Sequence, residues 1–279
     1  MKPAITPSTA SSDNGAGRPS LTLWWAAAAL IAPVLLLQAL WLRWRVPRLP
    51  AAGGDIAGQC PPLDETAPER PPLRLLVIGE STAAGVGADS HHQGFVGHTA
   101  GALAASTGRS VSWEVFGISG ITAAELRSEL RRQPAGATLP LADILCVVLG
   151  VNDTLRLRSA RAWRRDYLAL VGDMQKLHPG ASVVCSGVPP LHRFPALPQP
   201  LRFMAAWRGR QMDRVLQSLA ASQGWRHVSV PNLNGDHPGH VRHQLFSPDG
   251  FHPSPAGYQR WCEDLVQSLL LTSGILSAQ

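Results

Sequence analysis

Residues 73–85 read LRLLVIGESTAAG and contain the signals that decide the fold. The first six residues form an almost continuous apolar run with the length of a buried strand. Gly79 then begins a sharp turn, which places Ser81 directly after that strand. In open α/β sheets, ligands bind at this edge, outside the carboxyl ends of the strands. Ser81 is therefore a candidate functional residue.

Further apolar runs of strand length recur along the chain, with segments of helical pattern between them. The expected strands are 73–78, 111–116, 144–149, 183–186 and 227–230. The expected helices are 122–132, with Thr122 and Glu125 as a capping box, 159–177, 203–222 and 255–271. This alternation predicts an α/β fold with a mainly parallel five-stranded sheet that helices cover on both faces.

Two later blocks contain the residue types that activate a serine hydroxyl as a nucleophile. Residues 150–153 read GVND and follow a predicted strand, and residues 247–253 read SPDGFHP near the C-terminus. A serine hydroxyl becomes an effective nucleophile when a histidine takes its proton and a carboxylate orients that histidine. Asp249 and His252 are three residues apart, which suits one loop that delivers both. The turn is not the G-x-S-x-G elbow, because Ala83 stands two residues after Ser81.

Taken in order, these blocks make residues 73–271 resemble the SGNH/GDSL hydrolase family of serine esterases and lipases. The resemblance implies the flavodoxin-like three-layer sandwich of that family. It also implies a nucleophile, an orienting acid, a general base and two oxyanion donors, one from the backbone and one from a side chain, which are respectively Ser81, Asp249, His252, Gly120 and Asn152.

One position departs from the family pattern. Glu80 stands where the G-D-S motif has aspartate. We expect this residue to shape the turn and the extra methylene to be tolerated. The other blocks also have structural interpretations: Asn152 and Asp153 are common in turns and caps, and Ser254 with Pro255 fits the start of a helix.

The resemblance implies a serine esterase that hydrolyses carboxylic ester or thioester bonds through an acyl-enzyme, with no cofactor. The substrate would be a small-molecule, lipid or glycan ester. Two alternatives stay open: an acyltransferase or carbohydrate deacetylase with the same triad, and a non-catalytic membrane-bound binding module. Residues 191–204 follow a predicted strand end, and their Phe, Leu and Met side chains either line an acyl pocket or pack as an ordinary loop.

The N-terminal part predicts a membrane location. Residues 21–42 contain no charged side chain, and as a helix they would be about 33 Å long, against about 30 Å for a hydrocarbon core. A cleaved signal peptide or a buried helix is the alternative. Arg43, Arg45 and Arg48 follow and favour a cytoplasmic catalytic domain. The expected organisation is a disordered tail at 1–20, a transmembrane helix at 21–42, a linker at 43–72 and the hydrolase domain at 73–279.

The formal net charge is +6, and most basic residues are arginines scattered over predicted helix faces. Solvated surface explains this pattern better than a nucleic-acid site. Two of the four cysteines, Cys146 and Cys185, fall inside predicted strands, so we expect free thiols and a reducing compartment.

One cluster of side chains has the types that bind zinc: Asp236, His237, His240 and His243. Glycine and proline residues between them indicate an irregular loop, and no helical H-E-x-x-H pattern is present. A polar loop beside the active site is the favoured interpretation, and no metal is expected.

Overall fold

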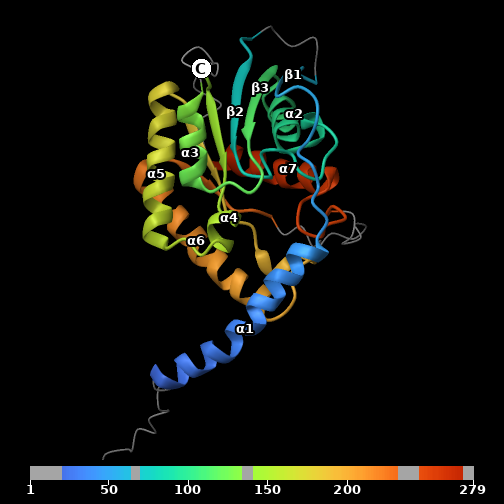
Figure 1. Ribbon diagram of the computed structural model, residues 1–279. Coiled ribbons are helices and arrows are strands. Elements are labelled where there is room, and N and C mark those ends of the chain that lie inside the picture. Colours follow the sequence, from blue (N-terminus) through green and yellow to red (C-terminus); the bar gives the residue numbers. More distant parts are fainter. Residues whose placement is uncertain (1–20, 64–69, 134–140, 232–244, 273–279) are drawn as a thin grey trace, which may run out of the picture.

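A six-stranded sheet with the strand order β1-β3-β2-β4-β5-β6 forms the centre of the molecule, and helices lie on both of its faces (Figure 1). The structure is a computed structural model that describes residues 21–63, 70–133, 141–231 and 245–272, with the backbone alone for residues 21–30 and 272. This arrangement confirms the predicted α/β fold with a mostly parallel sheet.

The five predicted strands are all present as parallel neighbours, with bounds within two residues of the expected ones. They are β2 (Leu73–Gly79), β3 (Val111–Gly117), β4 (Ile144–Val148), β5 (Ser182–Ser186) and β6 (Arg226–Val228). Their carboxyl ends meet at one edge of the sheet, because parallel strands share a direction.

The prediction of five strands is wrong by one. Residues 57–60, within the expected linker, form β1 (Ala57–Cys60), which pairs antiparallel with β3. The segment AGQC has little apolar alternation, so its pattern does not indicate a strand. Close packing selects it instead, since a Cβ at Gly58 would lie 2.4 Å from Cζ2 of Trp113.

Two helical layers cover the sheet (Figure 1). One contains α3 (Ala123–Arg132), α5 (Ala160–Leu177) and α6 (Leu201–Gln223), and the other contains α2 (Phe95–Thr107) and α7 (Pro255–Thr272). Neighbouring residues of β2 point into two different cores: Leu76 belongs to the core that contains Trp163 of α5, and Val77 belongs to the core that contains Phe95 of α2. Short helices complete the fold: η1 (His91–Gln93), α4 (Val151–Leu155) and η2 (Leu191–Arg193).

Local signals predict the helix ends well. Thr122 and Glu125 form the expected capping box at the start of α3, and Ser159 accepts a hydrogen bond from Ala162 N at the start of α5. α2 is missing from the predicted helices, because its sequence FVGHTAGALAAST is rich in small residues and shows a weak apolar face.

The N-terminal segment forms α1 (Leu21–Arg45), so a helix is present where the transmembrane segment is expected. Its assignment as a span is not supported: within the described ranges, no helix combines the length and apolar character that crossing a bilayer requires. The described side chains of α1 contact the segment at the start of α6. Gln38 Nε2 donates to Gln199 O (2.5 Å), and Leu201 N donates to Gln38 Oε1 (3.1 Å).

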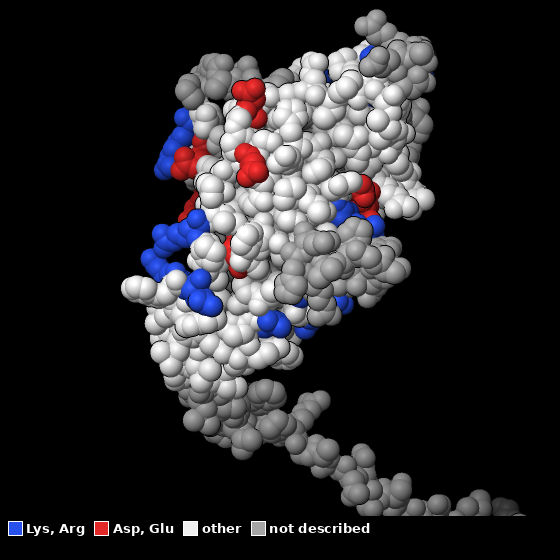
Figure 2. Space-filling view, turned by 90° about the vertical axis from the view of Figure 1, so that its right-hand side faces the viewer, with Lys and Arg blue, Asp and Glu red and all other residues white. Residues whose placement is uncertain are grey.

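Surface arginines form ion pairs with neighbouring carboxylates. Arg127 and Arg131 both contact Asp173, at 2.7 and 2.9 Å, and Arg156 contacts Glu125 at 2.8 Å. Figure 2 shows basic residues in separate groups, several beside acidic ones, on a face that is mostly uncharged. The four cysteines are free thiols, as expected.

Candidate active site

Ser81 lies in the turn directly after β2. Glu80 N donates to Val148 O (3.0 Å) and Val86 N donates to Ser81 O (3.0 Å), so backbone hydrogen bonds hold the residue on both sides. A glycine is required at the last position of the strand, since a Cβ at Gly79 would lie 2.2 Å from Val148 O. The turn therefore places the Ser81 hydroxyl at the carboxyl edge of the sheet.

His252 and Asp249 meet Ser81 at this edge. His252 Nε2 lies 2.9 Å from Ser81 Oγ, and His252 Nδ1 lies 2.6 Å from Asp249 Oδ2. The Asp249 side chain is only 1% exposed. Burial by itself would raise the pKa of Asp249, but hydrogen bonds from the His252 ring and from the backbone N–H groups of Phe251 and His252 hold it below its ordinary value. Asp249 is thus a buried carboxylate kept in its acceptor form.

The loop that carries both residues is tied to the rest of the site. Ser247 N donates to His252 O (2.8 Å) and closes the loop on itself. The Ser247 hydroxyl contacts Pro253 O (2.8 Å) and Gly87 O (3.2 Å), which connects the loop to the turn that follows Ser81. α7 begins immediately afterwards at Pro255, as expected.

The two expected oxyanion donors follow the strands on either side of β2. Gly120 comes after β3, with a φ of +82°, and Asn152 lies in the first turn of α4, after β4. Because β3, β2 and β4 are adjacent, Gly120, Ser81 and Asn152 stand at neighbouring positions on one sheet edge. The Gly120 carbonyl accepts a hydrogen bond from Arg156 Nη2 (2.6 Å).

Glu80 makes contacts that sequence reasoning missed. Its Oε1 accepts from Val151 N (2.9 Å), and its Oε2 accepts from Asn152 N (3.0 Å) and from the Asn152 side-chain nitrogen Nδ2. Burial, with the residue 3% exposed, raises the pKa of Glu80 to about 7, and the hydrogen bonds partly offset this rise. Its carboxylate therefore joins two strand ends as well as occupying the turn. The departure from aspartate in the motif was the available signal.

Asp153 has the structural role that its alternative interpretation indicated. Its Oδ2 accepts from Ala123 N (3.0 Å) at the start of α3, which connects α4 to α3. The residue is fully buried, and burial raises its pKa to about 6. It makes no hydrogen bond to Ser81, Asp249 or His252.

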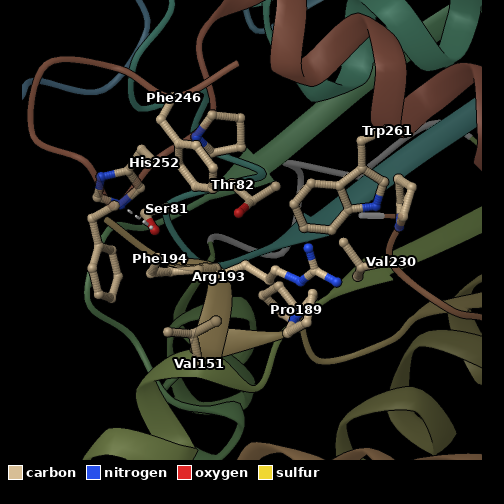
Figure 3. A pocket seen from close by; sticks show the side chains of 14 residues that line it. Ser81, Thr82, Val151, Pro189, Arg193, Phe194, Val230, Phe246, His252 and Trp261 are labelled. Carbon is tan, nitrogen blue, oxygen red and sulfur yellow. Dashed lines mark hydrogen bonds between the residues drawn. The ribbon is translucent and has the colours of Figure 1, made fainter. Parts of the chain in front are cut away.

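A pocket opens beside Ser81 and His252 (Figure 3). Its walls are mainly apolar and are formed by Val151, Pro189, Phe194, Val230, Phe246 and Trp261. Figure 3 shows Ser81 and His252 at one side of the pocket, with Trp261 and Val230 farther along it. The side chain of Arg193 lies between these two regions.

Residues 191–204 divide between the two interpretations left open for them. Arg193 and Phe194 line the pocket, whereas Phe203 and Met204 belong to α6 and are 60% and 40% exposed. Phe194 packs edge-on against Phe246 and Phe251, with ring centroids 5.7 and 5.0 Å apart. Trp261 and Val230 were not predicted for the pocket, because they come from distant parts of the chain.

The candidate metal ligands, Asp236, His237, His240 and His243, lie outside the described residues. Among the residues that the structure does describe, no group of three or more His, Cys, Asp or Glu side chains is arranged to hold a metal ion.

Comparison with known proteins identifies the class to which this fold and site belong. Residues 77–260 match the model of the GDSL-like lipase/acylhydrolase family. The chain therefore belongs to this family.

Individual relatives agree with this assignment. The chain is similar to the GDSL-like esterase Rv1075c of Mycobacterium tuberculosis, with 26% identity over 186 residues that cover 67% of this chain. The match spans 58% of the length of that relative. The solved structure of TesA is similar with a TM-score of 0.52 and 25% identity, covering 70% of this chain and 97% of TesA. The lipase Lip_vut3 from a goat rumen metagenome shares the fold, with a TM-score of 0.56 and 20% identity over 70% of this chain and 97% of the lipase.

Proposed function

We propose that this chain is a serine esterase that cleaves carboxylic esters through an acyl-enzyme formed on Ser81. The observation that carries the proposal is the continuous chain of contacts from Ser81 Oγ to His252 Nε2 and from His252 Nδ1 to Asp249 Oδ2. A carboxylate that accepts from Nδ1 leaves the lone pair of Nε2 facing the hydroxyl, and this is the tautomer that a general base requires.

In the proposed reaction, Ser81 Oγ attacks the ester carbonyl carbon while His252 Nε2 takes the hydroxyl proton. The carbonyl oxygen becomes an oxyanion, which the backbone N–H groups of Ser81 and Gly120 and the amide of Asn152 would stabilise. His252 then returns the proton to the leaving alcohol as the C–O bond breaks. Water attacks the acyl-enzyme by the same route and releases the acid.

The pocket supports a substrate with an apolar group next to the ester. Phe194, Phe246 and Trp261 present hydrophobic surface within the pocket that contains Ser81. Apolar walls with a few polar groups are typical of small-molecule sites. We propose an acyl or alkyl chain along these walls, with the scissile carbonyl between Ser81 and the oxyanion donors.

The test is covalent labelling followed by turnover. Full-length protein is incubated with a fluorophosphonate probe and assayed with p-nitrophenyl esters of increasing acyl length. We expect labelling at Ser81, confirmed by peptide mass, and hydrolysis of at least one ester. An alcohol acceptor added to the assay that diverts the acyl group from free acid to a new ester would reassign the chain as an acyltransferase. Absence of both labelling and turnover would remove the serine mechanism.

A membrane-associated location is also proposed. Several large apolar side chains of α1 are exposed, among them Leu37 (65%) and Trp44 (88%), and α1 extends away from the catalytic domain (Figure 1). Arg43 and Arg45 lie in the last turn of α1 and Arg48 lies just after it, and these charges support a cytoplasmic catalytic domain. Reporter fusions after Gln279 test the orientation: activity of alkaline phosphatase with loss of fluorescent-protein signal would contradict it. Recovery of the full chain without detergent would contradict the association.

A further inference from the structure

We propose that Glu80 is a positioning residue for ester hydrolysis, because its carboxylate holds the Asn152 amide in the orientation that donates to the oxyanion. The inference rests on the proposed function and assigns to Glu80 a task beyond shaping the turn. Glu80 is the sequence neighbour of Ser81. One turn would therefore position both the nucleophile and, through Glu80, the donor that stabilises the oxyanion formed by its attack.

Three N–H groups converge on the Glu80 carboxylate. Oε1 receives Val151 N at 2.9 Å, and Oε2 receives Asn152 N at 3.0 Å together with Asn152 Nδ2. Two of these donors are backbone groups of α4 and fix the position of the helix start. The third belongs to the side chain that the proposed mechanism uses, so backbone and side chain of Asn152 are held by the same group.

The chemistry of the two side chains determines which way the amide faces. An ionised carboxylate only accepts hydrogen bonds, whereas the asparagine amide has an accepting oxygen and a nitrogen with two hydrogens. Oxygen facing oxygen would be repulsive, so Asn152 turns Nδ2 toward Glu80. One hydrogen of Nδ2 is then used by Glu80, and the second is available to a developing oxyanion.

Burial makes this orientation strict. Glu80 is 3% exposed, so water cannot take the place of a hydrogen-bond donor that its carboxylate loses. The loss of a donor therefore leaves a buried polar group without a partner, which is costly. A glutamine of the same size would change the rule, since its side-chain nitrogen donates. Asn152 could then turn its oxygen toward residue 80 and away from the role of donor. The charge of Glu80, more than its volume, is therefore the property that matters.

A double-mutant cycle tests the inference. The kcat and KM of wild type, Glu80→Gln, Asn152→Ala and the double variant are measured with one p-nitrophenyl ester at pH 8, above the pKa of about 7 that burial gives Glu80, so that its carboxylate is mainly ionised. We expect Glu80→Gln to lower kcat by about 10- to 100-fold with little change in KM, which approaches the effect of losing one oxyanion donor. In the Asn152→Ala background the same substitution should cost less than about threefold, because residues that act as a unit are not additive.

Equal losses in the two backgrounds, or wild-type kcat in Glu80→Gln, would overturn the inference. Glu114→Gln is the control: it removes a partly buried carboxylate in the middle of β3, away from Ser81, and should leave kcat unchanged. If Glu80→Gln does not fold, as judged by circular dichroism, Glu80→Asp takes its place in the cycle. It keeps the charge and shortens the reach, so we expect a smaller loss that also disappears in the Asn152→Ala background.

The proposed function has a separate readout. If it is wrong, wild-type protein neither hydrolyses esters nor reacts with the fluorophosphonate probe. If only the role of Glu80 is wrong, wild-type protein shows both activities and the cycle is additive.

Discussion

His252 Nε2 lies 2.9 Å from Ser81 Oγ, although 171 positions separate the two residues in the chain. Ser81 is held by the turn after β2 and His252 by the loop before α7, and Ser247 hydrogen bonds connect these two segments. The turn and the loop thus fix the positions of both residues of the pair. The contribution of each residue to ester hydrolysis can be measured by substitution.

Replacing the hydroxyl tests the nucleophile. We expect Ser81→Ala to lower ester hydrolysis by about 10⁴-fold or more, since the remaining groups retain only binding and oxyanion stabilisation. Fluorophosphonate labelling should disappear, while the circular dichroism spectrum and melting temperature stay close to wild type. Near wild-type turnover by purified Ser81→Ala would contradict the serine mechanism.

Replacing the orienting acid tests the histidine tautomer. Asp249→Asn keeps an oxygen for the backbone N–H groups of Phe251 and His252, but it presents an amide to His252 Nδ1. His252 would then carry its proton on Nε2 and fail as a base, so we expect kcat to fall by about 10⁴-fold. The kcat of the variant at several pH values checks this. A rise in KM with an unchanged kcat would assign Asp249 to substrate binding.

The pocket wall should set acyl-chain preference. Phe194→Leu reduces an aromatic side chain that lines the pocket and packs against Phe246 and Phe251. We expect the ratio of kcat/KM for hexanoyl and acetyl p-nitrophenyl esters to change by about tenfold, the scale of small changes in an apolar pocket. Phe203→Leu is the control, because Phe203 is 60% exposed and does not line the pocket. An unchanged ratio in Phe194→Leu would place the acyl chain elsewhere.

The buried carboxylate Glu80 should make stability depend on pH. Burial raises the pKa of Glu80 from 4.5 to about 7 in the folded state. Between these two values the folded state binds more protons than the unfolded state, so the free energy of unfolding should fall as pH rises from about 5 to 7 and change little above. Asp153, with its pKa raised to about 6, acts in the same direction.

Urea denaturation at pH 5, 6, 7 and 8 checks this dependence. Glu80→Gln removes one titrating group, so its free energy of unfolding should fall less steeply with pH than that of wild type. Parallel pH profiles for the two proteins would show that Glu80 does not titrate in this range.

Local sequence determined most of the regular elements, with β1 and α2 as exceptions, and the positions of the candidate site residues. The apolar run LRLLVI is buried on both sides as β2, and Thr122 with Glu125 begins α3 through short-range hydrogen bonds. The candidate residues Ser81, Gly120 and Asn152 each follow a strand that the pattern predicts. Because parallel strands end on the same edge, their proximity could be expected before the structure was known.

Only the tertiary structure decided which segments that are distant in the chain contact each other, because no local sequence pattern links them. β1 pairs with β3 through backbone groups, which any sequence carries, and the small residues that allow this pairing resemble those of a linker. Glu80 reaches the start of α4 across 72 positions because β2 and β4 are neighbours in the sheet. Trp261 lines the pocket from α7, which packs against α2 although about 150 positions separate the two helices in the chain. Such contacts depend on the three-dimensional path of the backbone, which short-range periodicity does not encode.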